Sequence, residues 1–154
     1  QQMIDAYVAL RAQSTEQPQL DYLVINSTHF PYSYPETFQR FTPVVELDGM
    51  AMKASSIQYL ANNKPQVKRR FLNAVAYADH LIGNLLAGLE ESGRLEETVV
   101  VVVGDHGQEF WEHNRFSHSW SFVDEQTQVV AMMKFPQAVE NNLADAVGDF
   151  GLKS

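Results

Sequence analysis

The stretch TVVVVVGDHG, residues 98–107, decides the fold of this 154-residue chain. Five consecutive valines follow the threonine, and a β-branched run that is apolar on both faces is typical of a central strand covered by helices. The run ends in Gly104-Asp105-His106-Gly107, where two glycines permit tight turning and the close approach of a ligand. We therefore predict a buried strand that delivers Asp105 and His106 to one edge of a sheet.

A long helix is predicted before this strand, from Pro65 to about Glu91. Pro65 stands at its start and Gly93 just beyond its end, which is the asymmetry expected of helix termini. Apolar residues recur at three- and four-residue steps and mark the face that packs on a core. They are Phe71, Val75, Ala78, Ile82, Leu85 and Leu89. Polar residues on the opposite side, Lys68, Asn73, Asn84 and Glu91, are expected to face solvent.

Shorter elements complete the prediction. The pattern indicates weak helices at about 4–12 and 139–147, a short helix at about 51–60, buried strands at 22–25 and 129–133, and an extended proline- and aromatic-rich loop at 30–48. The order strand, helix, strand predicts an α/β fold with a mostly parallel sheet flanked by helices. We expect a single domain over residues 1–154.

Composition limits the classes of function. A formal net charge of −8 argues against a nucleic-acid partner, because phosphate contacts need clustered Lys and Arg. The short basic run Lys68-Arg69-Arg70 is interpreted as a solvated helix face. The absence of cysteine excludes disulfides, thiolate catalysis and cysteine-based zinc sites. No apolar run is long enough to span a membrane.

Asp105 and His106 are the strongest candidates for chemistry. A carboxylate and an imidazole directly after a rigid strand can point at one ion, so the pair predicts half of a metal site. In open α/β sheets, ligands gather at the carboxyl ends of the strands. The alternative is a simple turn at the strand exit, in which Asp105 caps a helix and His106 is solvated.

Two further histidines are candidates at the same edge. His118 ends an aromatic-rich stretch and would serve as a second-metal ligand or as a donor to a bound oxyanion. His29 follows the strand predicted at 22–25 and precedes Pro31, which stiffens its loop. Each also has a plain interpretation as a hydrogen-bonded loop histidine. Glu109 would either orient a histidine or be solvated.

The ordered combination of motifs resembles the C-terminal half of the alkaline phosphatase/sulfatase superfamily. It consists of Thr28-His29-Phe30-Pro31-Tyr32, Asp79 in the long helix, the valine run into Gly104-Asp105-His106-Gly107-Gln108-Glu109-Phe110, and Ser117-His118. The likeness covers about residues 22–136. Within the superfamily, the chain is similar to the sulfatase-like periplasmic domains of bacterial inner-membrane proteins. Examples are lipoteichoic acid synthase, phosphoethanolamine transferases and cardiolipin-binding sulfatase-like proteins. The resemblance implies a fragment of an alkaline-phosphatase-like fold, with a membrane anchor in preceding segments.

The resemblance also implies roles for individual residues. Asp105 and His106 match ligands of the catalytic metal, His118 matches a contact to the transferred group or to a second metal, and His29 matches a substrate contact. Zinc or manganese is favoured over calcium or magnesium, because an Asp-His pair resembles the phosphotransfer branch whereas true sulfatases usually have Asp-Asn. The family's nucleophile and first metal carboxylate lie upstream of the His-Pro-Tyr loop and are expected outside this chain. Residues 141–151 match the family pattern poorly.

The activity that the resemblance implies is a metal-dependent hydrolase or phosphoryl transferase. Its substrate would be a phosphate ester, with a sulfate ester less favoured, on lipid head groups or cell-envelope glycans. An upstream hydroxyl would attack phosphorus and then pass the group to water or an acceptor. Because position 1 is not methionine and a helical pattern begins at once, we expect a fragment that is inactive alone. The alternative is a catalytically silent sulfatase-like module that binds lipid or a protein partner and regulates envelope assembly. The oligomeric state stays open.

Overall fold

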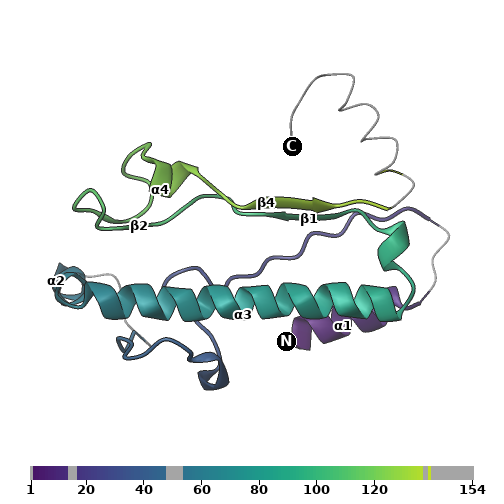
Figure 1. Cartoon of the computed structure of the whole chain (residues 1–154), viewed down its shortest axis with the longest axis horizontal. Helices are drawn as coiled ribbons and strands as arrows, with labels where there is room; N and C mark the ends of the chain where they lie inside the picture. Colours follow the sequence, from purple (N-terminus) through teal and green to yellow (C-terminus); the bar gives the residue numbers. More distant parts are fainter. Residues whose placement is uncertain (1, 14–16, 48–53, 137–138, 140–154) are drawn as a thin grey trace. The chain divides into compact units, whose positions relative to one another are not determined.

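The structure is a computed structural model that describes residues 2–13, 17–47, 54–136 and 139 (Figure 1). The chain divides into two compact units. Unit 1 comprises Gln1–Ser14, Leu85–Glu109 and His118–Ser154, and unit 2 comprises Thr15–Asn84 and Phe110–Ser117. The helix predicted at 139–147 lies outside the described residues, apart from position 139.

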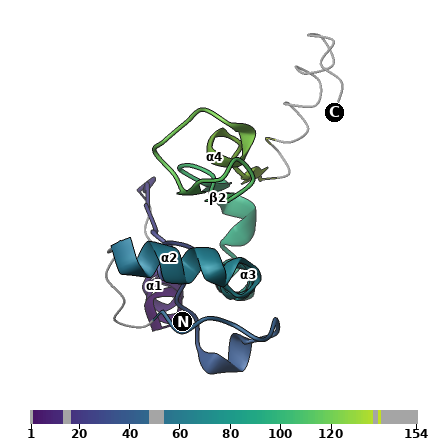
Figure 2. The same cartoon turned by 90° about the vertical axis from the view of Figure 1, so that its left-hand side faces the viewer.

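Helices account for most of the regular structure, and the long helix runs across Figure 1 and is seen nearly end-on in Figure 2. In chain order the elements are α1 (Gln2–Arg11), the 3-10 helix η1 (Glu36–Phe38), α2 (Ala54–Asn62), α3 (Lys64–Glu91), the 3-10 helix η2 (Leu95–Glu97), β1 (Val100–Val103), β2 (Glu109–Phe110), β3 (Phe116–Ser117), α4 (Asp124–Thr127) and β4 (Ala131–Lys134). In the described part of the chain, no helix combines the length and the apolar character that crossing a membrane requires.

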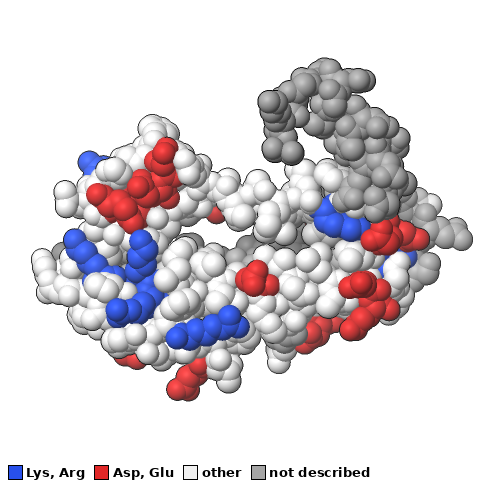
Figure 3. All heavy atoms as spheres, viewed as in Figure 1, with Lys and Arg blue, Asp and Glu red and all other residues white. Residues whose placement is uncertain are grey.

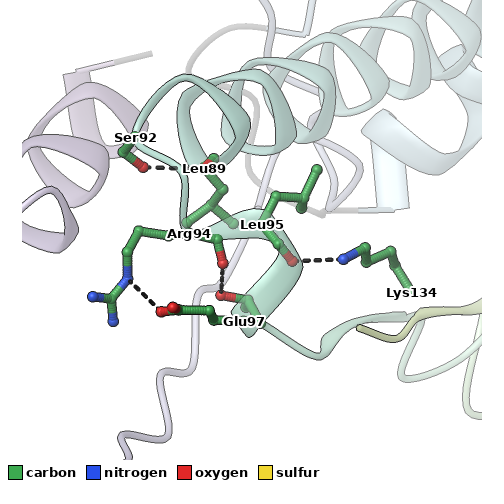
Figure 4. A network of polar contacts seen from close by, with 7 residues as sticks. Leu89, Ser92, Arg94, Leu95, Glu97 and Lys134 are labelled. Carbon is green, nitrogen blue, oxygen red and sulfur yellow. Dashed lines mark hydrogen bonds and ion pairs between the residues drawn. The ribbon is translucent and has the colours of Figure 1, made fainter. Parts of the chain in front are cut away.

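The prediction of α3 is confirmed, and so is the position of its C-terminal glycine. Gly93 has φ +70°, and the amide of Arg94 donates to the carbonyl of Leu89 at 2.8 Å while that of Gly93 donates to Glu90 at 2.9 Å. This pair of hydrogen bonds is the Schellman motif, which satisfies the last carbonyls of a helix. After this motif, Lys134 Nζ donates to the carbonyl of Leu95 at 2.6 Å (Figure 4). This hydrogen bond joins η2 to β4.

The core of unit 2 is built around α2 and α3. Its buried members are Tyr32, Val45, Leu47, Leu60, Val67 and Ala74, and partly buried aromatic residues pack against them. Asn73 was predicted to face solvent, and that prediction is wrong, because its side chain is fully buried. Its Oδ1 accepts from the amides of Arg40 and Phe41, both at 2.9 Å. A satisfied buried amide therefore fastens the proline-rich loop to α3.

The basic run on α3 is solvated only in part. Lys and Arg side chains gather over the first half of α3 on the face drawn in Figure 3. Lys68 is exposed and pairs with Glu112 at 3.3 Å. Arg70, by contrast, is 7% exposed and donates to the carbonyls of Pro31 at 2.9 Å and Val45 at 3.2 Å. Arg70 thus serves the packing of the loop rather than a solvated face.

The predicted strand at 22–25 is not a strand in the structure. Tyr22 is 88% exposed and Val24 is 55% exposed. A strand needs a neighbour for its backbone hydrogen bonds, and none of the strands in the described ranges pairs with this segment. The β-rich composition alone therefore did not produce a strand.

The valine run forms β1, but its pairing and burial differ from the prediction. β1 pairs antiparallel with β4, with Val100 opposite Lys134 and Val103 opposite Ala131, so the expected mostly parallel sheet is not found among the described strands. β1 is half-buried on one face and exposed on the other, with Val103 63% exposed. The strand predicted at 129–133 is found as β4, which begins two residues later, ends one residue later and is largely exposed. Neither strand is central, because each has one described neighbour.

Candidate metal centre

Asp105 and His106 follow β1 after a single glycine. The amide of His106 donates to Asp105 Oδ1 at 3.0 Å, and Asp105 Oδ2 lies 3.8 Å from His106 Nε2. A nitrogen ligand about 2.1 Å and an oxygen ligand about 2.2 Å from one zinc ion can be at most about 4.3 Å apart. The separation therefore allows one ion to contact both side chains. The Asp105 side chain is 90% exposed, so an ion can reach it from solvent.

The hydrogen bond of His106 determines which nitrogen can bind a metal. Its Nδ1 lies 2.8 Å from the carbonyl oxygen of Gly107. Because a carbonyl only accepts, Nδ1 carries a proton, and in the neutral ring the lone pair is on Nε2. Metal-binding histidines are commonly oriented through such a bond from the other ring nitrogen. His106 therefore presents its basic nitrogen on the side of Asp105.

His118 lies directly beside this pair. The centroid of its ring is 3.8 Å from that of His106, and the two ring planes are inclined by 32°. Its Nδ1 lies 3.2 Å from Gln108 Oε1, and an amide oxygen only accepts, so His118 also carries its proton on Nδ1. The structure thus brings together three residues that the sequence nominated. Gln108, which orients His118, was not nominated, and nothing in its local pattern indicated this contact.

Glu109 is fully buried, so its interpretation as a solvated carboxylate is wrong. Its Oε2 accepts from Gln126 Nε2 at 2.7 Å. A buried carboxylate needs such a donor, because removal from water without compensation is costly. Glu109 therefore belongs to the internal support of the loop that follows His106.

His29 belongs to unit 2, whereas Asp105, His106 and His118 belong to unit 1. Its Nδ1 donates to the carbonyl of Phe30 at 2.7 Å, so Nε2 carries the lone pair here too. The turn is closed by the amide of Tyr32, which donates to the carbonyl of His29 at 2.7 Å. The exposed ring is thus held on a rigid turn, and its part in the site stays a prediction.

Among the described residues of unit 2, Tyr32 and Glu112 have shifted pKa values. Burial raises the pKa of Tyr32 well above its usual range, and its hydroxyl has no hydrogen-bond partner among the described residues. For Glu112, partial burial opposes ionisation, but hydrogen bonds from the amides of Glu112 and Phe110 and the nearby Lys68 outweigh it, so the pKa is lowered. The carboxylate of Glu112 thereby holds the β2–β3 turn to α3.

The residues present fit half of a metal site. A carboxylate oxygen with an imidazole nitrogen suits zinc or manganese better than calcium, which prefers oxygen ligands only. Protein zinc sites use three or four side chains. Within the described ranges, no group of three or more His, Asp or Glu side chains surrounds a common point. A complete metal site would therefore need further ligands in addition to Asp105 and His106.

Comparison with known proteins gives two matches. The family model described as Sulfatase matches residues 1–149. Arylsulfatase from Clostridium perfringens (strain 13 / Type A) is 37% identical over 57 residues, which are 35% of this chain and 12% of that protein. The chain thus spans a small part of the length of this relative.

Proposed function

The chain belongs to the sulfatase family, whose domain has an alkaline-phosphatase-like α/β fold, and on that premise we propose that it carries the Asp-His part of a metal-dependent ester-hydrolysing or phosphoryl-transferring centre. The observation that carries the proposal is the 3.8 Å separation of Asp105 Oδ2 and His106 Nε2. Both atoms are of the kind that binds a divalent ion.

Each side chain has a distinct role in this proposal. Asp105 and His106 hold the metal, which when bound would lower the pKa of a hydroxyl nucleophile and offset charge on the transferring oxygens. His118, beside His106, donates to an oxygen of the transferred group in its protonated form. His29 contacts the substrate from its own rigid turn. The nucleophile comes from elsewhere in the protein.

The substrate in this proposal is a phosphate ester in preference to a sulfate ester. An imidazole ligand favours zinc or manganese over calcium, and the Asp-His pair resembles the phosphotransfer branch of the superfamily. We further propose a lipid head group or cell-envelope glycan as substrate, and a periplasmic domain of a bacterial inner-membrane protein as the setting. These two points rest on the resemblance of residues 28–32 and 104–110.

A catalytically silent sulfatase-like module is the second candidate. The observation that favours it is the lack of a third ligand beside Asp105 and His106 in the described part of the chain. Such a module would bind a lipid or protein partner and would need no metal at this place.

Zinc and manganese titrations of the chain test the first candidate. We expect Asp105→Ala and His106→Ala each to weaken metal binding at least tenfold at neutral pH. The matched control is the double variant Asp79→Ala/His80→Ala, which removes the other Asp-His dipeptide of the sequence. That dipeptide lies on α3, where successive side chains point about 100° apart, so its loss should leave the affinity unchanged. Equal affinity in the unmodified chain and the Asp105 and His106 variants would exclude the metal centre.

Anion titrations of the zinc-loaded chain then test the substrate class. Inorganic phosphate should bind more tightly than sulfate. The reverse order would contradict the preference for phosphate esters while leaving the metal centre intact.

A further inference from the structure

Gln126 connects the two segments that carry His106 and His118. It lies on α4, and its side chain is 5% exposed. Its Nε2 donates to Glu109 Oε2 at 2.7 Å and to Ser121 Oγ at 3.0 Å. Its Oε1 accepts from the amide of Trp120 at 3.3 Å. The amide of one side chain is therefore bonded at both ends, to residues shortly after each histidine.

The backbone of Gln126 adds a contact on the His106 side. Its carbonyl accepts from the amide of Gly107 at 2.9 Å. A Cβ at Gly107 would lie 2.1 Å from the carbonyl oxygen of Glu125 and 2.9 Å from that of Gln128, so only glycine allows this approach. The loop after His106 is thus seated directly on the backbone of α4.

The chemistry of these contacts favours an amide at position 126. The carboxylate of Glu109 is fully buried and needs a donor, whereas the amide of Trp120 needs an acceptor. Gln provides both from one side chain. A carboxylate at 126 would face that of Glu109, and an apolar side chain would leave Glu109 without this donor, which is costly inside a protein.

We propose that Gln126 is a positioning residue that sets the separation of the His106 and His118 rings. The separation of the two rings matters for catalysis only if the proposed function holds. The positioning itself is a property of the chain without metal. It can therefore be tested apart from metal binding.

The test uses nuclear Overhauser effects between the ring protons of His106 and His118 in the metal-free chain, well below its melting temperature. The unmodified chain should show these effects, because the ring centroids are 3.8 Å apart. Gln126→Met should lose them while far-UV circular dichroism stays unchanged. Gln128→Met, an exposed glutamine two residues on, is the matched control and should keep them. A purely structural role for Gln126 would lower the melting temperature without separating the rings.

A paired exchange keeps the proposal testable if Gln126→Met does not fold. Gln126→Glu alone should separate the rings, because two carboxylates would then face each other. Adding Glu109→Gln restores a donor opposite a carboxylate, and the ring effects should return. Persistence of the ring effects in Gln126→Glu, or their failure to return in the double variant, would overturn the proposal. Either result would leave the zinc titrations of Asp105 and His106 unaffected as a separate test of the metal centre.

Discussion

The rings of His106 and His118 lie face to face, 3.8 Å apart between centroids and inclined by 32°. Each ring uses Nδ1 for a hydrogen bond, His106 to the carbonyl of Gly107 at 2.8 Å and His118 to Gln108 Oε1 at 3.2 Å. In the neutral form of each ring, the lone pair is therefore on Nε2. Asp105 Oδ2 lies 3.8 Å from His106 Nε2, so in the proposed centre His106 binds the metal, whereas His118 contacts the transferred group.

Replacing His118 by Phe should separate these tasks. The aromatic ring is kept and both nitrogens are removed. Since the described residues form no three-ligand group with Asp105 and His106, we expect the zinc dissociation constant to change by less than about twofold, while phosphate binding to the zinc-loaded chain weakens about tenfold. Calorimetric titration measures both. A tenfold loss of zinc affinity would make His118 a ligand of the first metal instead.

Gly107→Ala should destabilise the chain strongly. The added Cβ would meet backbone oxygens of Glu125 and Gln128 at 2.1 and 2.9 Å, and backbone cannot move aside as a flexible side chain can. We expect a loss of about 2–3 kcal/mol, at the upper end for overpacking. The measurement is the urea unfolding midpoint. Gly83→Ala is the control, because nothing lies within 4 Å of its Cβ, and it should stabilise α3 by about 0.5–1 kcal/mol.

Gly93→Ala measures the free-energy cost of the left-handed backbone conformation at the end of α3. No atom lies within 4 Å of the added Cβ, but the residue has φ +70°. An L-residue with a Cβ pays about 1 kcal/mol for this left-handed conformation. The urea midpoint should fall with an unchanged m-value. Gly93→Asn should lose less, because Asn tolerates this region, and an equal loss in both variants would contradict this explanation.

Tyr32→Phe should leave stability at neutral pH unchanged or raise it. The hydroxyl of Tyr32 is buried without a hydrogen-bond partner in the described part of the chain, so its removal relieves a desolvation cost of about 1–3 kcal/mol. Burial raises the pKa of Tyr32 in the folded state above its ordinary value of 10.0. As the pH rises, the unfolded state therefore loses the Tyr32 proton before the folded state does. The free energy of unfolding is thus unaffected by this titration below about pH 10 and falls above pH 10 by about 1.4 kcal/mol per pH unit.

Chemical denaturation between pH 8 and pH 11 checks this prediction. The stability difference between Tyr32→Phe and the unmodified chain should grow above pH 10, because the variant lacks the titrating group. A constant difference across the range would mean that the hydroxyl is hydrated or bonded in solution.

The amino-acid sequence by itself determined the features that depend on near neighbours along the chain. α3 follows from a periodic apolar stripe with proline at its start and Gly93 after its end, because helical hydrogen bonds and side-chain contacts join residues three and four apart. The proximity of Asp105 and His106 follows in the same way, since adjacent residues in a tight turn cannot separate. The resemblance to the family was also readable from ordered motifs, and the matching family model bears it out.

Only the tertiary structure decided the features that join distant residues. β1 has β4 as its antiparallel neighbour, and the β-rich segment at 22–25 has none among the described strands, because composition does not specify a strand's partner. Asn73 was expected to face solvent and Gln126 was not singled out in the sequence, yet each is buried and hydrogen-bonded to residues elsewhere in the chain. The burial of a polar side chain depends on whether folding brings it a partner, and that partner cannot be read from its own position in the sequence.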